Sequence, residues 1–250
     1  TVCVSIMAVV FCVTMFVVKP NWGEVFQGII PTIPNGAIMT CVALIGTTVV
    51  PYNLFIHATS SHQTWHDPDE IPLAEFDVRC SMIIGGFITG AVMVTAGTVM
   101  RGMSVNSAID MAAQLEPLLG NLSVPFLAIG LICAGISSAV ITPLGVSYVL
   151  SGLFGWKLDR SDKRYFFTNI AIVVFGIIGA ATGFNPLTII MAAQAVNGVF
   201  LPVSVFVLLY LASRSSVMGQ HKNKPLQIIL GSAVFIISLV IGISSVMSLF

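Results

Sequence analysis

The stretch GTTVVPYN at residues 46–53 interrupts the second long apolar run of the chain with polar residues that carry no charge. Pro51 has no backbone N–H, so the carbonyl of Thr47, four residues earlier, loses the partner that a continuous helix would give it. In lipid, such a carbonyl is costly unless protein, water or an ion satisfies it. Interrupted helices are tolerated where they line a cavity, as in transporters, and we therefore expect a substrate site at this break.

The composition is that of a membrane protein. Hydrophobic residues make up 56% of the chain and charged residues 8%, against roughly 25% charged residues in a soluble domain. The formal net charge is zero, which gives no basis for a nucleic-acid partner. The five cysteines form no CxxC pair and are typical of small buried hydrophobic residues.

Seven apolar runs are long enough to cross a bilayer if about 20 residues make one crossing. They cover residues 1–18, 36–61, 77–100, 124–153, 165–182, 186–212 and 226–249. Between the first two, residues 22–34 contain two prolines and are expected to form a short interfacial helix or loop. The sequence thus predicts an all-α membrane protein, a polytopic helix bundle in which residues 1–250 form a single transmembrane domain with a broken second span.

Lysine and arginine are distributed unevenly over the predicted loops. The loops after spans two, four and six hold eight of them, whereas the loops after spans one, three and five hold two, Lys19 and Arg101. Because cytoplasmic loops carry the excess of positive charge, the first set of loops is predicted to be cytoplasmic. The broken span then runs inward, and we expect an integral, multi-pass protein of the plasma (inner) membrane. The chain begins at Thr1 inside an apolar run, so we also expect earlier spans to precede it.

Five stretches resemble, in the same order, segments of the Nramp family of divalent-metal transporters. They are KPNWGEVFQGIIP at 19–31, GTTVVPYNLFIH at 46–57, DMAAQLEPLLG at 110–120, GISSAVITPLGVSYVLSGLFG at 135–155 and QAVNGVFLP at 194–202. The resemblance implies a LeuT-type fold of two inverted repeats, of which this chain would be the C-terminal part, helices five to eleven. It also implies a metal ion as substrate, the lipid bilayer as surroundings and the N-terminal half of the same transporter as partner.

The resemblance assigns roles to residues at the break. The family's carbonyl ligand on helix six falls on Thr47, the residue that the proline argument selects independently. The family's methionine ligand falls on Val50, whose side chain has no lone pair for a metal. Asn53 is expected to bond backbone groups that the break frees. The broken helix as a whole comprises Gly46, Thr48, Pro51 and Asn53 besides these two positions.

Two amides in the sixth span are further candidates for the metal site. Gln194 matches a family glutamine that approaches the metal, and Asn197 lies one turn further on. Amides inside a membrane also commonly bond a neighbouring helix, and this alternative stays open for both.

The loss of the family's methionine bears on the choice of metal. Sulfur ligands select softer metals, whereas carbonyl, carboxylate and water oxygens suit Mg²⁺, Ca²⁺ and Mn²⁺. Mg²⁺ also tends to keep several of its waters. We therefore expect a partly hydrated oxygen-ligand site that favours Mg²⁺ and also passes Mn²⁺, as in the Nramp-related magnesium transporters. The alternatives are proton-coupled Mn²⁺ or Fe²⁺ transport, Al³⁺ transport, and an amino-acid or solute symporter on the same fold.

Proton coupling is expected to be weak or absent. The family's first helix-six histidine falls on Tyr52, and tyrosine titrates at about pH 10 rather than at about 6.5. The second histidine is kept as His57, for which a structural role and a proton relay are equally open. No enzyme is expected, because HExxH, GxSxG and paired intramembrane carboxylates are all missing from the sequence, and no cofactor is expected other than the transported Mg²⁺ or Mn²⁺.

A polar loop follows the broken span. His62, His66, Asp67, Asp69 and Glu70 have spacings that would suit metal ligands on a helix. Because Pro68 interrupts any such helix, a polar exit loop is the favoured interpretation.

Overall fold

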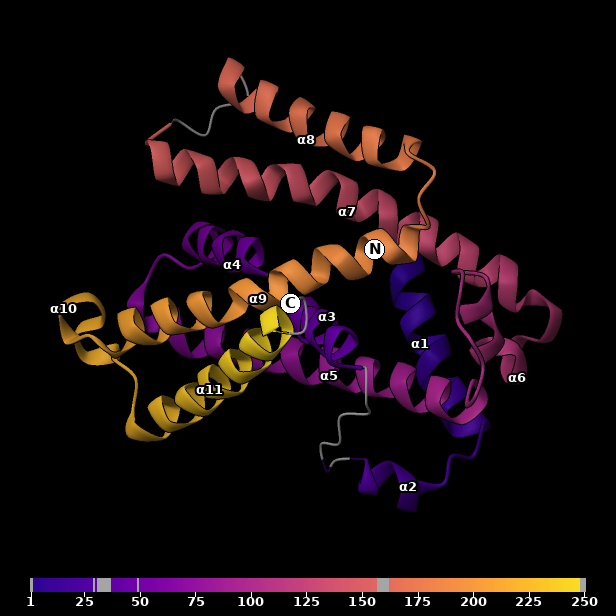
Figure 1. The fold of residues 1–250 in the computed structure, drawn as a ribbon. Helices are drawn as coiled ribbons and strands as arrows, with labels where there is room; N and C mark the ends of the chain where they lie inside the picture. The colour runs from indigo at the N-terminus through magenta and orange to yellow at the C-terminus, as the bar shows by residue number, and fades with distance from the viewer. Residues whose placement is uncertain (1, 29, 31–36, 49, 157–161, 248–250) are drawn as a thin grey trace. The chain divides into compact units, whose positions relative to one another are not determined.

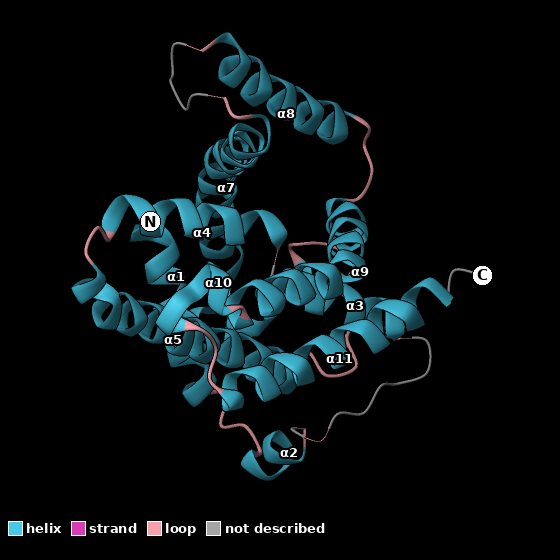
Figure 2. Cartoon of the chain, turned by 90° about the vertical axis from the view of Figure 1, so that its left-hand side faces the viewer, coloured by secondary structure: helices cyan, strands magenta, loops and turns pink. Residues whose placement is uncertain are grey.

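A computed structural model describes residues 2–28, 30, 37–48, 50–156 and 162–247. Within these ranges the chain is helical, with turns and loops between the helices and no strand (Figure 2). The chain divides into two compact units. The first consists of Thr1–Pro31 and Ile56–Gly183, and the second of Thr32–Phe55 and Phe184–Phe250.

The first unit is built around long apolar helices (Figure 1). Helix α1 packs against α5 and α7, and α7 packs along α8. A small core forms where 3₁₀ turns meet α1 and α7, with Phe11, Ala112, Leu115 and Leu127 buried in it. The helices of this unit are α1 (Val2–Val17), α2 (Trp22–Gln27), most of α4 (Pro51–Thr64), α5 (Ile71–Val99), α6 (Glu116–Leu119), α7 (Ser123–Phe154) and α8 (Lys163–Ala181), with 3₁₀ turns at Pro68–Glu70, Asp110–Leu115 and Gly120–Leu122.

The second unit is a packed group of helices centred on α9 (Pro186–Ser213). Helix α9 contacts α3 (Ile38–Thr48) on one side and α11 (Pro225–Met247) on another, and α3 also contacts α11. Val42, Ala43 and Ala195 form the buried core between α3 and α9. The short helix α10 (Ser215–Met218) follows α9, and the first turn of α4 completes the unit.

Polar residues begin several of these helices. Asn21, Asp162 and Asn185 each accept a bond from the backbone N–H two residues later, at the starts of α2, α8 and α9. Such side-chain caps satisfy backbone donors that have no partner in the first turn of a helix.

Four helical stretches in the described ranges are long and apolar enough to cross a membrane: Ile71–Val99, Asp110–Phe154, Lys163–Ala181 and Pro186–Ser213. Two further apolar helical stretches, Val2–Val17 and Pro225–Val240, are shorter. The second predicted span is indeed broken, because α3 ends at Thr48 and α4 begins at Pro51. The prediction of an all-α polytopic membrane bundle is therefore confirmed, whereas the single domain and the inverted repeats stay predictions.

The predicted span boundaries differ most at α5. This helix begins at Ile71 instead of residue 77, and Pro72 lies in its first turn. Proline is compatible with that position, where its missing N–H would have no partner in any case. Hydropathy detects only the apolar part of a helix and leaves out the charged first turns of α5, which explains why its start was predicted too late. Between the first two spans, α2 supplies the short helix that the sequence predicts, and residues 31–36 lie outside the described ranges.

Candidate functional site

The break between α3 and α4 has a defined backbone geometry on its α4 side. Val50 belongs to neither helix, and its carbonyl accepts a bond from the Asn53 N–H at 3.0 Å. Val50 is half-buried. Residue 49 and the side chains of Thr48, Pro51 and Tyr52 lie outside what the structure describes, so the interpretations that depend on those side chains stay predictions.

Thr47 lies in the last turn of α3 and is exposed. Its Oγ1 donates to the Leu44 carbonyl at 2.6 Å. The hydroxyl is thus bonded back into its own helix, a common arrangement for threonine. The Thr47 carbonyl faces a different situation, because the residue four positions on is Pro51, which has no N–H to donate. The carbonyl oxygen of Thr47 is therefore a candidate ligand for an ion, and Oγ1, which donates its proton to Leu44, also keeps its lone pairs.

Helices α3 and α9 touch through their backbones beside this break. A Cβ atom built on Gly46 would collide with the Gln194 carbonyl oxygen and would lie 2.7 Å from the Gly198 nitrogen. Likewise, a Cβ atom on Gly198 would lie 2.5 Å from the Val42 carbonyl oxygen. A side chain at either position would have to push the helices apart, since real Cβ atoms do not approach backbone so closely. The contact places the turn of α9 from Gln194 to Gly198 against the residue that precedes Thr47.

The two amides of α9 are bonded to each other. Asn197 Nδ2 donates to Gln194 Oε1 at 3.0 Å, and both side chains are half-buried. Residues three apart share one face of a helix, and Gln194 and Asn197 therefore act as neighbours on α9. Each amide oxygen has two lone pairs, so Gln194 Oε1 keeps one for another partner and Asn197 Oδ1 can also accept.

The structure brings Thr47, Val50, Gln194 and Asn197 into the same compact unit, which no apolar pattern could have established. Gly198 is the residue of this region that sequence reasoning missed. The available signal was a glycine in the middle of a strongly apolar helix, which commonly marks a close backbone approach or a functional position. Asn53 and His57 on α4 are exposed, and His57 belongs to the other unit.

Among the described residues, no group of three or more His, Cys, Asp or Glu side chains is placed to hold a metal ion. In the polar loop after α4, Glu70 Oε2 accepts the backbone N–H groups of His66 at 2.9 Å and Asp67 at 3.2 Å. These two donors hold the pKa of the Glu70 carboxyl below its ordinary value. Glu70 thereby shapes the turn before α5.

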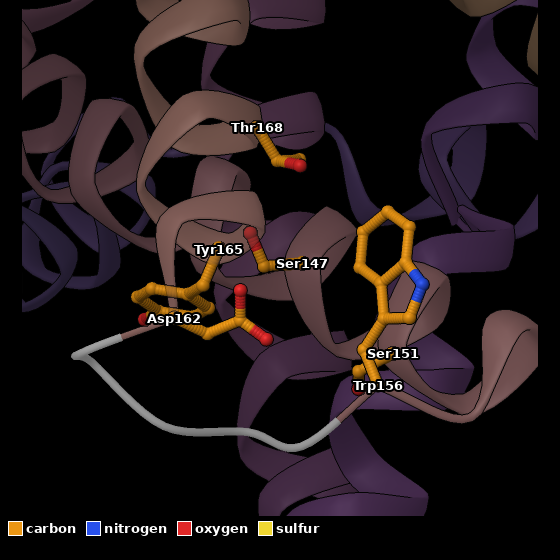
Figure 3. A pocket seen from close by; sticks show the side chains of 6 residues that line it. All are labelled: Ser147, Ser151, Trp156, Asp162, Tyr165 and Thr168. Atoms are coloured by element: carbon orange, nitrogen blue, oxygen red, sulfur yellow. The ribbon is translucent and has the colours of Figure 1, made fainter.

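A polar pocket lies between the end of α7 and the start of α8, and Figure 3 shows its lining. The buried Ser147 and Ser151 of α7 line it together with Asp162, Tyr165 and Trp156. Asn169 Nδ2 donates to Ser147 Oγ at 2.9 Å and ties α8 to α7. The pocket leaves no room for a water molecule. It is therefore a packed polar contact and offers no space for an ion with its ligands.

The α3–α9 region thus combines an interrupted helix, a carbonyl without its helical donor and a pair of amide oxygens. Oxygen donors of this kind are the ligands that hard cations such as Mg²⁺ and Mn²⁺ prefer. The soft ligands that select Cu⁺ or Fe–S clusters are not part of this set.

Comparisons with known proteins show the family of the chain. The family description "Natural resistance-associated macrophage protein-like", or Nramp, matches residues 1–248. The chain is 25% identical to a protein of Clostridium acetobutylicum over 98% of the chain and 57% of that relative. It is 26% identical to one of Aeromonas hydrophila (96% and 59%) and 27% identical to one of Brucella suis (88% and 52%).

All three relatives are named divalent metal cation transporter MntH. The chain spans about half the length of these relatives, and the match extends over nearly all of its own residues. Since the family description covers the chain almost from end to end, the protein belongs to the Nramp family.

Proposed function

We propose that this chain forms the metal-binding C-terminal part of a secondary transporter of divalent metal cations. The observation that carries the proposal is the backbone contact of Gly46 with the Gln194–Gly198 turn, which brings the broken helix and the amide pair together. Family membership and the printed names of the relatives support the same substrate class. In a LeuT-type arrangement, such a break would lie near the membrane midplane.

The transported ion in this proposal is Mg²⁺, with Mn²⁺ also accepted. The Thr47 carbonyl and the amide oxygens of Gln194 and Asn197 are hard ligands, and Val50 contributes no lone pair where a methionine would contribute sulfur. Three protein oxygens do not fill an octahedral shell of six, so the ion keeps water or takes further ligands from the N-terminal half of the transporter.

Titration calorimetry of the purified protein with Mg²⁺, Mn²⁺ and Cd²⁺ tests the choice of metal. We expect Mg²⁺ and Mn²⁺ to bind more tightly than Cd²⁺, because the proposed ligands are all oxygen atoms. Val50→Met should tighten Cd²⁺ binding relative to Mg²⁺ by about tenfold, which corresponds to about 1.4 kcal/mol for one added sulfur ligand.

Val50→Leu is the matched control, because leucine is close to methionine in size but has no sulfur. It should leave the ratio of Cd²⁺ to Mg²⁺ affinity unchanged. Tight Cd²⁺ binding by the unmodified protein, together with no response to Val50→Met, would refute the oxygen-ligand site. Failure of every divalent metal to bind would refute the proposed function as a whole.

Weak or absent proton coupling is part of the proposal, since Tyr52 stands where a histidine would titrate near neutral pH. Uptake of Mg²⁺ or Mn²⁺ into proteoliposomes that contain a pH-sensitive dye separates this case from proton-coupled Mn²⁺ or Fe²⁺ transport. We expect metal entry without a matching fall in internal pH. Acidification in proportion to metal uptake would establish coupling and contradict the role given to Tyr52.

A further inference from the structure

A groove of about 570 Å³ lies in the first unit between α2 and the C-terminal half of α5. Its volume falls within the range of about 300–1,000 Å³ that is typical of ligand sites. The α5 wall includes Gly90, Val94 and Gly97, and Arg101 follows just after the end of α5. Asn21 and Glu24 at the start of α2 line the other side. We refer to this site as the α2–α5 groove.

The floor of the α2–α5 groove is open. A Cβ atom built on Gly90 or on Gly97 meets no atom within 4 Å, so neither glycine is needed for a close helix contact. From Gly90 to Val99, where it ends, α5 rises about 14 Å at about 1.5 Å per residue. This is close to half of a hydrocarbon core of about 30 Å, or the depth of one leaflet. The apolar length of the groove therefore matches one acyl chain of a lipid.

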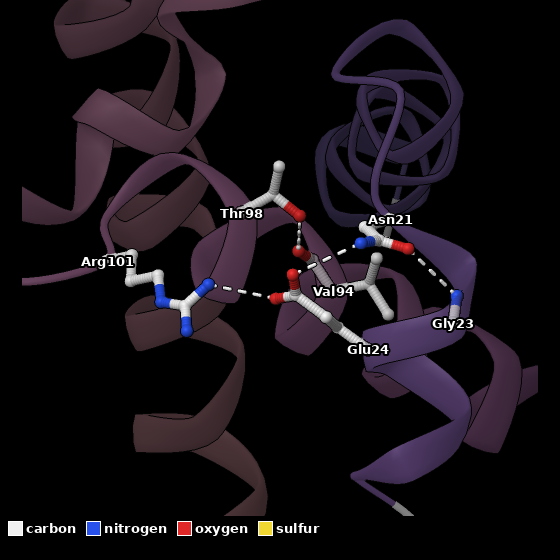
Figure 4. Close-up of polar contacts among 6 residues, drawn as sticks. All are labelled: Asn21, Gly23, Glu24, Val94, Thr98 and Arg101. Atoms are coloured by element: carbon white, nitrogen blue, oxygen red, sulfur yellow. Dashed lines mark hydrogen bonds and ion pairs between the residues drawn. The ribbon is translucent and has the colours of Figure 1, made fainter.

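The polar end of the groove carries two opposite charges (Figure 4). Arg101 Nη1 lies 2.8 Å from Glu24 Oε2, and Asn21 Nδ2 donates to Glu24 Oε1 at 3.1 Å. The side chains of Arg101 and Glu24 are 78% and 56% exposed. An ion pair with such exposure contributes little by itself, so both charges can take other partners at small cost.

We propose that the α2–α5 groove binds a zwitterionic phospholipid whose headgroup carries a primary ammonium, as in phosphatidylethanolamine. The lipid phosphate lies against the Arg101 guanidinium, its ammonium donates to the Glu24 carboxylate, and one acyl chain follows the glycine floor. The phosphate of phosphatidylglycerol would pair with Arg101 in the same way, but its neutral glycerol offers Glu24 only hydroxyl donors, which bond a carboxylate less strongly than an ammonium does. A quaternary choline headgroup has no N–H to donate to that carboxylate.

Native mass spectrometry of the protein tests the proposal, after exchange into nanodiscs that contain equal amounts of phosphatidylethanolamine, phosphatidylcholine and phosphatidylglycerol. We expect one phosphatidylethanolamine to be retained in preference to the other two lipids. Gly97→Leu fills the floor of the groove and should reduce this retention about tenfold. Gly85→Leu is the matched control on the same helix, because its Cβ position is equally open and it does not line the groove.

Two charge variants test the headgroup contacts. Glu24→Gln should remove the preference for phosphatidylethanolamine over phosphatidylcholine, and Arg101→Gln should weaken retention of all three lipids. Equal retention of the three lipids by the unmodified protein would overturn the proposal. Undiminished retention by Gly97→Leu, while Gly85→Leu behaves as the unmodified protein, would equally overturn it.

Discussion

Substituting Gly198 by alanine adds one methyl group at the backbone contact between α3 and α9. The new Cβ atom would lie 2.5 Å from the Val42 carbonyl oxygen and 2.7 Å from Val42 Cγ1. Both distances are far below van der Waals contact, and the nearer atom is backbone, which no rotamer change can move away. Helices α3 and α9 must therefore separate.

The size of the effect follows from two opposing contributions. Overpacking of this kind costs about 1–3 kcal/mol. Replacing glycine in a helix interior gains about 0.5–1 kcal/mol in helix propensity. The overlap is the larger contribution, so we expect a net loss of about 1–2 kcal/mol. For a chain of this length, that lowers the Tm by about 2–8 °C.

Thermal unfolding of the purified protein in detergent measures this change. Gly176→Ala in α8 is the control, because a Cβ atom there meets nothing within 4 Å and only the gain in helix propensity remains. We expect the Tm to rise slightly for Gly176→Ala and to fall for Gly198→Ala, with weaker Mg²⁺ binding in the second variant. A Tm for Gly198→Ala equal to or above that of Gly176→Ala would refute the backbone contact.

Three further outcomes are expected. Gln194→Ala and Asn197→Ala should each weaken Mg²⁺ binding in calorimetry, because both amide oxygens are proposed ligands, and unchanged binding in Asn197→Ala would contradict the site of three protein oxygens. Glu70→Gln should flatten the acid side of a plot of Tm against pH. The pKa of the Glu70 carboxyl is lowered in the fold, so its ionised form stabilises the protein at pH values above the ordinary pKa of 4.5, and this stabilisation is lost as the pH falls below 4.5. Asp69→Asn is the control for Glu70, and equal acid limbs in the protein and in Glu70→Gln would contradict that role. Asn169→Ala removes the hydrogen bond to Ser147 of α7 and leaves that buried hydroxyl without this partner, which should cost about 1.5–2 kcal/mol. In the same assay the Tm should fall by about 3–8 °C, and an unchanged Tm would contradict the contact.

Much of the fold could be predicted from apolar run length alone. Helix α7 (Ser123–Phe154) and α9 (Pro186–Ser213) begin and end within a residue of the predicted spans 124–153 and 186–212. Run length sets these boundaries because every backbone group in lipid must be bonded within its own segment. The break before Pro51 was predictable for the same reason, since proline removes one of those bonds.

The candidate site was only partly predictable. Thr47 follows from the position of Pro51, because the chemistry is local in sequence. The contact of Gly46 with Gln194 and Gly198 joins positions about 150 residues apart in the chain, and no periodicity encodes which two helices meet. The bond from Asn197 to Gln194 also depends on rotamers that spacing leaves open.

The touching backbones of α3 and α9 set a minimum width for the space beside them. Neither helix can move closer, because Gly46 and Gly198 already have no side chains left to lose. The main chains of the two helices cannot draw together around a guest that is too small, and a guest that needs a wider separation has to force them apart. Discrimination by radius would then come from the main chain, and substitutions among the surrounding side chains would change it little.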